Sequence, residues 1–132
     1  VGLKNIGNTC FFNAIIQLLT TLAPLARWLV ESHWQMCSRK PDEDCVACKL
    51  GKHVLMAYTS EISLDMKWSG SLIQRFFPAR KENRMEDSHE CLLLIREALN
   101  DQSAVASSLE GSPIDSIFKF QVLQSTTCIK CG

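Results

Sequence analysis

The sequence predicts an α+β chain, with a mainly helical part over residues 1–113 and the start of a β-ribbon over residues 114–132. Two observations predict the helical part. Apolar residues recur at helical spacing in several segments, and proline, glycine or charged stretches separate those segments. A third observation predicts the ribbon, because Phe118, Phe120 and Val122 alternate with polar residues in the way of a β-strand.

The first predicted helix begins near Cys10 and is apolar on two adjacent faces. Its apolar residues are Phe11, Ile15, Leu18 and Leu22 on one face and Phe12, Ile16 and Leu19 on the other. A helix that is apolar over so much of its circumference is typical of a buried central element. Asn8 or Thr9 is a good N-cap, so Cys10 is predicted to lie in the first turn. There the free backbone N–H groups and the helix dipole favour the thiolate, which is the reactive form of cysteine.

The next elements are separated by proline and by polar residues. Pro24 interrupts the first pattern, and a short helix is predicted over residues 25–30. Residues 31–44 are polar and contain a further proline, so a loop is predicted there. Apolar residues then recur at helical spacing and predict an amphipathic helix over about residues 45–60.

The second half of the helical part contains two further predicted helices. A short apolar helix over about residues 72–77 is stopped by Pro78. Asp87-x-x-Glu90 reads as a capping box that opens another helix. Residues 100–113 are rich in serine, glycine and aspartate and predict a loop, after which a strand is predicted from Ile114 to about Thr127.

The composition limits the classes of function. The chain has 132 residues, of which 46% are hydrophobic, so it can build a core. Its 14 basic and 14 acidic side chains give no net charge, which predicts neither nucleic acid nor a membrane surface as a partner. We see no apolar run of transmembrane length and no signal peptide. Because the chain starts at Val1 rather than Met and ends one residue after Cys131, we expect it to be a piece of a longer protein.

Seven cysteines are present, and four of them fall in two C-x-x-C pairs. An odd number in this arrangement is not typical of a secreted disulfide scaffold. It favours a reducing compartment, the cytoplasm or the nucleus, with metal sites and one reactive thiol.

A first metal site is predicted from His33-x3-Cys37-x7-Cys45-x2-Cys48, which places four zinc-type ligands within sixteen residues. A metal ion would hold this otherwise polar loop in place. His53 lies five residues beyond Cys48 and competes with His33 for the fourth ligand position. The alternative interpretation is three unligated thiols in a reducing compartment.

A second C-x-x-C pair, Cys128 and Cys131, follows the predicted strand and forms half of a zinc ribbon. Two ligands cannot make a stable structural site. We therefore expect these two cysteines to bind zinc only with ligands from the rest of the longer protein.

The segment Gly2-Leu3-x-Asn5-x-Gly7-Asn8-Thr9-Cys10-Phe11-x-Asn13, followed by Gln17-x-Leu19, resembles the Cys box of the ubiquitin-specific proteases. These are papain-like deubiquitinating cysteine proteases. The resemblance implies a papain-like fold, of which this chain would supply the helical thumb and the start of the fingers ribbon. It also implies that Cys10 is the nucleophile and that Asn5 helps to form the oxyanion hole. Without the resemblance, Asn5 would be read as a turn residue that tolerates a left-handed backbone.

A second segment resembles the same family. Met85-Glu86-Asp87-Ser88-His89-Glu90-Cys91-Leu92 is similar to the family's Gln-Gln-Asp-Ala-x-Glu-Phe-Leu, with Met85, Glu86 and Cys91 departing from it. The resemblance implies that Asp87, with Glu90 beside it, contacts the arginine-bearing C-terminal tail of ubiquitin. The alternative is a plain capping box, and both roles are compatible. Some ubiquitin-specific proteases look similar in the ligand spacing of the first metal site, and the resemblance favours His33 over His53.

The family's catalytic base lies later in the chain, and none of His33, His53 and His89 lies in a segment that resembles the family's His box. We therefore expect the fragment alone to be inactive and the longer protein to be a deubiquitinase that acts on ubiquitin and ubiquitinated proteins. A larger complex is the other expected partner. One alternative is a catalytically inactive ubiquitin-binding or scaffolding protein. A third hypothesis is a zinc-bound interaction module without a role in ubiquitin chemistry.

Overall fold

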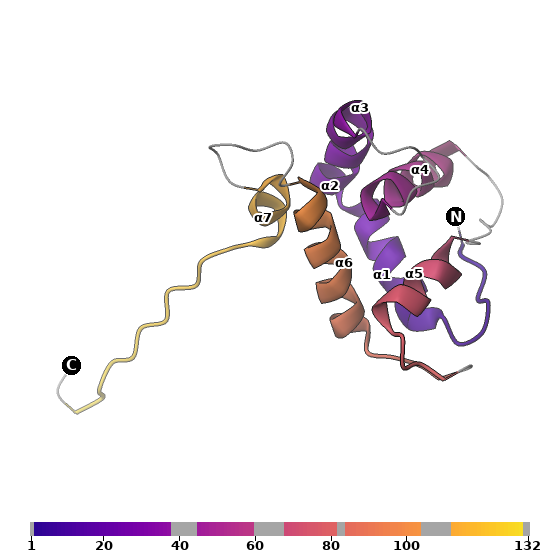
Figure 1. The fold of residues 1–132 in the computed structure, drawn as a ribbon. Helices are drawn as coiled ribbons and strands as arrows, with labels where there is room; N and C mark the ends of the chain where they lie inside the picture. Colours follow the sequence, from indigo (N-terminus) through magenta and orange to yellow (C-terminus); the bar gives the residue numbers. More distant parts are fainter. Residues whose placement is uncertain (1, 38–44, 60–67, 82–83, 104–111, 131–132) are drawn as a thin grey trace.

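A computed structural model of the chain describes residues 2–37, 45–59, 68–81, 84–103 and 112–130. The described residues form a helical body, from which residues 119–130 extend away (Figure 1). The helical elements in chain order are α1 (Cys10–Thr21), α2 (Ala23–Arg27), the π-helical segment η1 (Trp28–His33), α3 (Trp34–Met36), α4 (Val46–Thr59), α5 (Ser69–Phe76), α6 (Ser88–Ser103) and α7 (Pro113–Phe118).

Helix α1 lies at the centre of the body and packs against α2, α4 and α6 (Figure 1). Its buried apolar residues come from both predicted faces: Phe11, Phe12, Ile15, Ile16 and Leu19. Leu18 departs from the predicted pattern, because 54% of its surface is exposed. Thr9 is the N-cap residue and Cys10 is the first residue of the helix, so the prediction of a buried helix with Cys10 in its first turn is confirmed.

The helical chain continues through α2, η1 and α3, so the predicted loop over residues 31–44 is wrong for residues 31–36. The physical reason is tertiary packing, because Trp28, Leu29 and His33 are all buried on the side that faces α4. Gly51 of α4 allows this close approach, since a Cβ atom there would lie 3.3 Å from the Leu29 carbonyl oxygen. Residues 38–44 lie outside the described residues.

Helices α4 and α5 follow the predicted segments. Helix α5 ends at Phe76, close before Pro78, as predicted. It packs beside the start of α1, because the Phe77 and Phe11 rings meet edge to face with centroids 5.7 Å apart. Trp68 meets Phe12 in a similar way at 6.1 Å.

Helix α6 packs against α1, α4 and α7 and extends to Ser103, four residues into the predicted loop. Cys91, Ile95 and Leu99 form its buried stripe, with the four-residue spacing of one helix face. Residues 104–111 of the predicted loop lie outside the described residues.

The strand predicted from Ile114 to about Thr127 is wrong at its start, where α7 forms instead. Ser112 caps this helix, because its Oγ accepts a hydrogen bond from the Ile114 N–H at 3.1 Å, and Pro113 occupies the first helical position. Local capping and the burial of Ile114 thus override the alternation that begins at Phe118. Residues 119–130 form no strand within the described part of the chain, and the division of the chain at residue 113 stays a prediction.

In the described ranges, no single helix is long and apolar enough to cross a membrane. The consecutive helical segments Cys10–Thr21 and Ala23–Met36 reach that length and apolarity only as a pair, and they are bent by 80° at the break between them.

The buried stripe of α6 gives a stability prediction. We expect Leu99→Ala to lower the free energy of unfolding by about 2–5 kcal/mol, because it leaves a cavity at a fully buried position. Leu93→Ala makes the same chemical change in the same helix, where 46% of the side chain is exposed, and should cost about 0.5 kcal/mol or less. Urea denaturation of the two variants measures the difference, and equal losses would contradict the described burial of α6.

Candidate active site and metal centre

Cys10 is exposed and is the first residue of α1, directly after a tight turn. Gly7 and Asn8 both have positive φ angles, 111° and 49°. Glycine and asparagine adopt this left-handed conformation more readily than other residues. The turn reverses the chain so that Thr9 is buried while the next residue, Cys10, faces solvent.

The Asn5 side chain organises this turn. Its Oδ1 accepts hydrogen bonds from the Gly7 N–H at 3.3 Å, the Thr9 N–H at 3.0 Å and the Thr9 hydroxyl at 3.1 Å. The Thr9 hydroxyl oxygen in turn accepts a hydrogen bond from the Ile6 N–H at 3.2 Å. Because these hydrogen bonds fix Oδ1, they also fix the orientation of the Asn5 amide group. Its Nδ2 atom therefore lies on the side away from these donors. The left-handed residues are Gly7 and Asn8, so Asn5 is not the left-handed residue that the alternative interpretation requires.

Two side chains from other elements support the turn. Asn13, one turn into α1, donates from Nδ2 to the Lys4 carbonyl oxygen at 3.2 Å. Arg80 donates to the Gly7 carbonyl oxygen at 3.0 Å and to the Arg84 carbonyl oxygen at 2.7 Å. Its guanidinium also lies 5.7 Å from the centre of the Phe11 ring. Arg80 therefore joins the Cys10 turn to the segment that leads into α6, a role that no sequence motif indicates.

The start of α6 lies beside the start of α1. The Met85 Sδ atom is 3.6 Å from the Cys10 Sγ atom, although the two residues are 75 positions apart. Two residues later, Asp87 Oδ1 accepts hydrogen bonds from the His89 N–H at 2.7 Å and the Glu90 N–H at 3.4 Å. The predicted capping role of Asp87 is thus confirmed. Asp87 and Glu90 are both exposed, and their role toward a substrate stays a prediction.

Among the described residues, no histidine is hydrogen-bonded to the Cys10 thiol. His33 and His53 are buried, and His89 is exposed on α6. That none of the three is the catalytic base stays a prediction.

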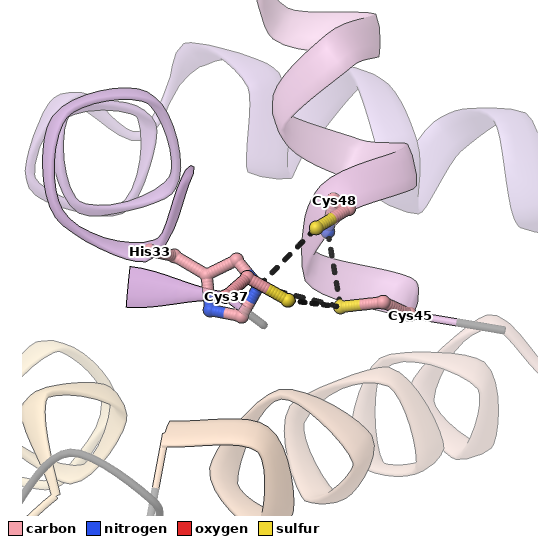
Figure 2. Close-up of side chains that lie close together, drawn as sticks. All are labelled: His33, Cys37, Cys45 and Cys48. Carbon is pink, nitrogen blue, oxygen red and sulfur yellow. Dashed lines mark hydrogen bonds between the residues drawn. The ribbon is translucent and has the colours of Figure 1, made fainter. Parts of the chain in front are cut away.

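The four predicted ligands of the first metal site point toward one another (Figure 2). His33 comes from η1, Cys37 follows α3, Cys45 precedes α4, and Cys48 lies in the first turn of α4. Their ligand atoms all lie within 4.8 Å of one another, and three of the four side chains are buried. The four side chains can therefore hold a metal ion.

The distances fit a tetrahedral zinc site. With Zn–S and Zn–N bonds of ordinary length, the edges of the tetrahedron are about 3.5 Å between N and S and about 3.8 Å between two S atoms. The His33 Nε2 atom lies 3.3 Å from Cys45 Sγ and 3.5 Å from Cys48 Sγ. Cys37 Sγ lies 3.9 Å from Cys45 Sγ. Three thiols and one imidazole at these separations are the ligand set of a structural zinc centre.

Ionisation of the Cys48 thiol is unfavourable in the absence of a cation. Burial raises the pKa of the Cys48 thiol well above its ordinary value, and the neighbouring Cys37 and Cys45 raise it further. Three thiolates this close together repel one another unless a cation lies between them. A zinc ion would supply that cation and bind the thiolate forms, so metal binding and proton release are coupled here.

His53 is not part of the metal centre. It lies on α4, where its ring is 5.8 Å from the Trp68 ring. Burial lowers the pKa of His53, which favours its neutral form. The spacing of the sequence left His33 and His53 open as the fourth ligand, and the structure places His33 in the cluster.

The second predicted metal site is not tested. Cys128 is exposed in the extended segment, and Cys131 lies outside the described residues.

Together, the fold and the two sites define a helical segment that presents an exposed cysteine at the start of a buried helix and that a metal centre stabilises. Comparison with known proteins identifies the family. The family model described as ubiquitin carboxyl-terminal hydrolase matches residues 1–132. The chain belongs to the ubiquitin carboxyl-terminal hydrolase family.

Relatives come from plants, fungi and animals. The chain is 28% identical to ubiquitin carboxyl-terminal hydrolase 25 of Arabidopsis thaliana, over 100% of this chain and 22% of that protein. It is 30% identical to the probable ubiquitin carboxyl-terminal hydrolase 16 of Schizosaccharomyces pombe, over 98% of this chain and 30% of that protein. Ubiquitin carboxyl-terminal hydrolase 17-like protein B of Mus musculus is 32% identical, over 89% of this chain and 25% of that protein. The chain thus spans less than a third of the length of these relatives.

The metal centre gives a prediction that separates the two histidines. We expect His33→Ala to weaken zinc binding by more than about 100-fold, because it removes a direct ligand rather than an outer partner. His53→Ala makes the same change in a histidine that is also buried but lies outside the cluster, and should leave zinc affinity unchanged. Competition with a chromophoric chelator measures both affinities. A larger loss for His53→Ala would contradict the assignment of His33.

Proposed function

We propose that the protein that contains this chain is a thiol-dependent deubiquitinase and that this chain supplies its nucleophile, Cys10. The observation that carries the proposal is the position of Cys10, exposed at the first residue of α1 and preceded by a turn that the Asn5 side chain closes. A cysteine side chain that is exposed at the start of a helix is open to the approach of a substrate carbonyl. The family assignment supports the same chemistry, because the relatives are named ubiquitin carboxyl-terminal hydrolases.

The proposed reaction has two steps. The Cys10 thiolate attacks the carbonyl carbon of the C-terminal glycine of ubiquitin, a C–S bond forms, and the C–N bond to the substrate amine breaks as the amine takes up a proton. Water then attacks the thioester, which releases the carboxylate of ubiquitin and returns the thiol. The negative oxygen of each tetrahedral intermediate accepts a hydrogen bond from Asn5 Nδ2. The base that transfers these protons comes from a part of the protein outside this chain.

The start of α6 is the proposed contact for the ubiquitin tail. Asp87 uses Oδ1 for capping, so Oδ2 is available to an arginine of the tail. Glu90 is exposed one turn further and adds a second negative charge. The contact between Met85 and Cys10 supports this placement, because it brings the α6 segment next to the nucleophile.

The proposal extends to the rest of the protein. The segment that follows α7 would lead into a fingers ribbon of a papain-like fold, in which Cys128 and Cys131 bind zinc with two ligands from elsewhere. The substrates would be ubiquitinated proteins, and a larger complex would recruit them. The unpaired cysteines Cys10 and Cys91 suit a reducing compartment, so we place the protein in the cytoplasm or the nucleus.

The second candidate is a catalytically inactive protein that binds ubiquitin. Met85 favours it, since a thioether 3.6 Å from Cys10 replaces a glutamine of the family's segment. Cys91 does not favour it, because its side chain is fully buried in the core and its replacement of an aromatic residue is a matter of packing.

Ubiquitin that carries a C-terminal electrophile distinguishes the candidates. We expect the full-length protein to form a covalent adduct and its Cys10→Ala variant to form none, while both bind ubiquitin with similar affinity. A gel shift measures the adduct, and Cys91→Ala serves as a control in which another thiol is removed. Binding without labelling of the unchanged protein would favour the inactive candidate, and labelling of Cys10→Ala would exclude Cys10 as the nucleophile.

The role of Asn5 gives a separate prediction. Asn5→Asp keeps an oxygen that can accept from Gly7 and Thr9 but removes the N–H donor, so the turn is retained and the oxyanion donor is lost. We expect kcat for a fluorogenic ubiquitin substrate to fall by about 100- to 1,000-fold with little change in KM. Asn5→Ala, which also loses the turn contacts, should be no more active than Asn5→Asp. Full activity of Asn5→Asp would mean that Asn5 only shapes the turn.

A further inference from the structure

Gln102 reaches the metal centre from a distant part of the sequence. It lies in the last turn of α6, where its side chain is half-buried. Its Oε1 atom is 3.0 Å from the Ala47 backbone nitrogen and 3.4 Å from the Cys45 Sγ atom. These contacts join residues 55 and 57 positions apart, and no spacing rule of zinc sites includes such a residue.

The bond from Ala47 has a clear structural reason. Ala47 is the second residue of α4, and the first N–H groups of a helix have no partner within the helix. The Gln102 amide oxygen therefore caps α4 from another helix. One residue further, the Cys48 N–H points to the Cys45 Sγ atom at 3.4 Å. The start of α4 is thus fixed by two backbone hydrogen bonds, one from the Ala47 N–H to the Gln102 amide and one from the Cys48 N–H to the Cys45 sulfur.

The chemistry of the Gln102 amide suits the metal-bound state. A thiol can donate its S–H to Oε1, but a zinc-bound cysteine is a thiolate and has only lone pairs. A glutamine amide carries an acceptor and a donor on the same carbon. With Oε1 kept on the Ala47 N–H, Nε2 can turn to donate to the Cys45 sulfur. A carboxylate or an apolar side chain at the same place cannot make both contacts.

We propose that Gln102 is a positioning residue of the metal centre, whose amide holds the start of α4 and the Cys45 thiolate in the metal-binding geometry. Partners that hydrogen-bond a metal ligand fix its orientation and change metal affinity by about 10- to 100-fold. The same contact attaches the last turn of α6 to the metal centre. This inference does not depend on the proposed protease activity.

The test uses the full-length protein and three variants. Gln102→Met keeps the length of the side chain and removes both polar contacts. Gln102→Glu keeps the acceptor for the Ala47 N–H but cannot donate to the Cys45 thiolate. Gln74→Met makes the first change at an exposed position of α5 and serves as the matched control.

Zinc affinity from chelator competition is the first measurement. We expect Gln102→Met and Gln102→Glu each to bind zinc about 10- to 100-fold more weakly than the unchanged protein, and Gln74→Met to bind with unchanged affinity. Unchanged affinity of Gln102→Met overturns the proposal. Unchanged affinity of Gln102→Glu also overturns it, because Gln102 would then act on α4 alone and not on the thiolate.

The spectrum of the cobalt-substituted protein is the second measurement, because it reports the geometry of the ligands directly. We expect the sulfur-to-cobalt charge-transfer bands to shift in Gln102→Glu and to remain unchanged in Gln74→Met. If Gln102→Met does not fold, Gln102→Glu decides the question. Bands and affinity identical to those of the unchanged protein would overturn the proposal whether or not the protein cleaves ubiquitin.

Discussion

The enclosure of α1 is the constraint on which the rest of the structure depends. This helix is apolar on two faces, so other elements must cover it, and α2, α4 and α6 do so. Its first residue, Cys10, is exposed, while Phe11 beside it is buried. A side chain held in this way has a fixed backbone but a free approach. The turn before it is fixed as well, by Asn5 from within and by Arg80 from the loop after α5.

Helix α6 separates the two sites. Met85, just before α6, contacts Cys10, and Gln102, in the last turn of α6, contacts Cys45 of the metal centre. Its 16 residues span about 24 Å at the rise of an α-helix. A metal ion at the far end cannot ligate or polarise a group that reacts at Cys10. A metal ion held there would therefore act on structure: it would join η1 and α3 to the start of α4, across a segment whose sequence is polar.

Local patterns made most of the helices and the ligand set predictable. Periodicity and caps encode α1, α4, α5 and α6, and the C-x-x-C spacing places two ligands at the start of α4. The rest depends on contacts between distant segments. The extension of the helix through His33 depends on packing against α4, and the choice between His33 and His53 depends on which way each helix faces. The strand prediction failed at Ile114 because the Ser112 cap and Pro113 favour a helix start more strongly than an alternation of three residues favours a strand. Neither Arg80 nor Gln102 carries a sequence signal, since each is defined only by the backbone groups that it reaches.

The cysteines show that the environment, rather than the residue type, determines the chemistry. Burial, with a smaller contribution from Glu90, raises the pKa of Cys91 to about 12, so this thiol stays protonated near neutral pH and is unreactive. Cys37, Cys45 and Cys48 are close enough to share one cation, which makes them ligands. Among the described cysteines, Cys10 combines exposure with the start of a buried helix, whereas Cys128, which is also exposed, lies in the extended segment. A thiol reagent that approaches the folded chain therefore reaches Cys10 at a helix start, while burial protects Cys91 and a shared cation would protect the cluster. The fold thus separates the thiols in a structural environment from the one that it exposes at a helix start.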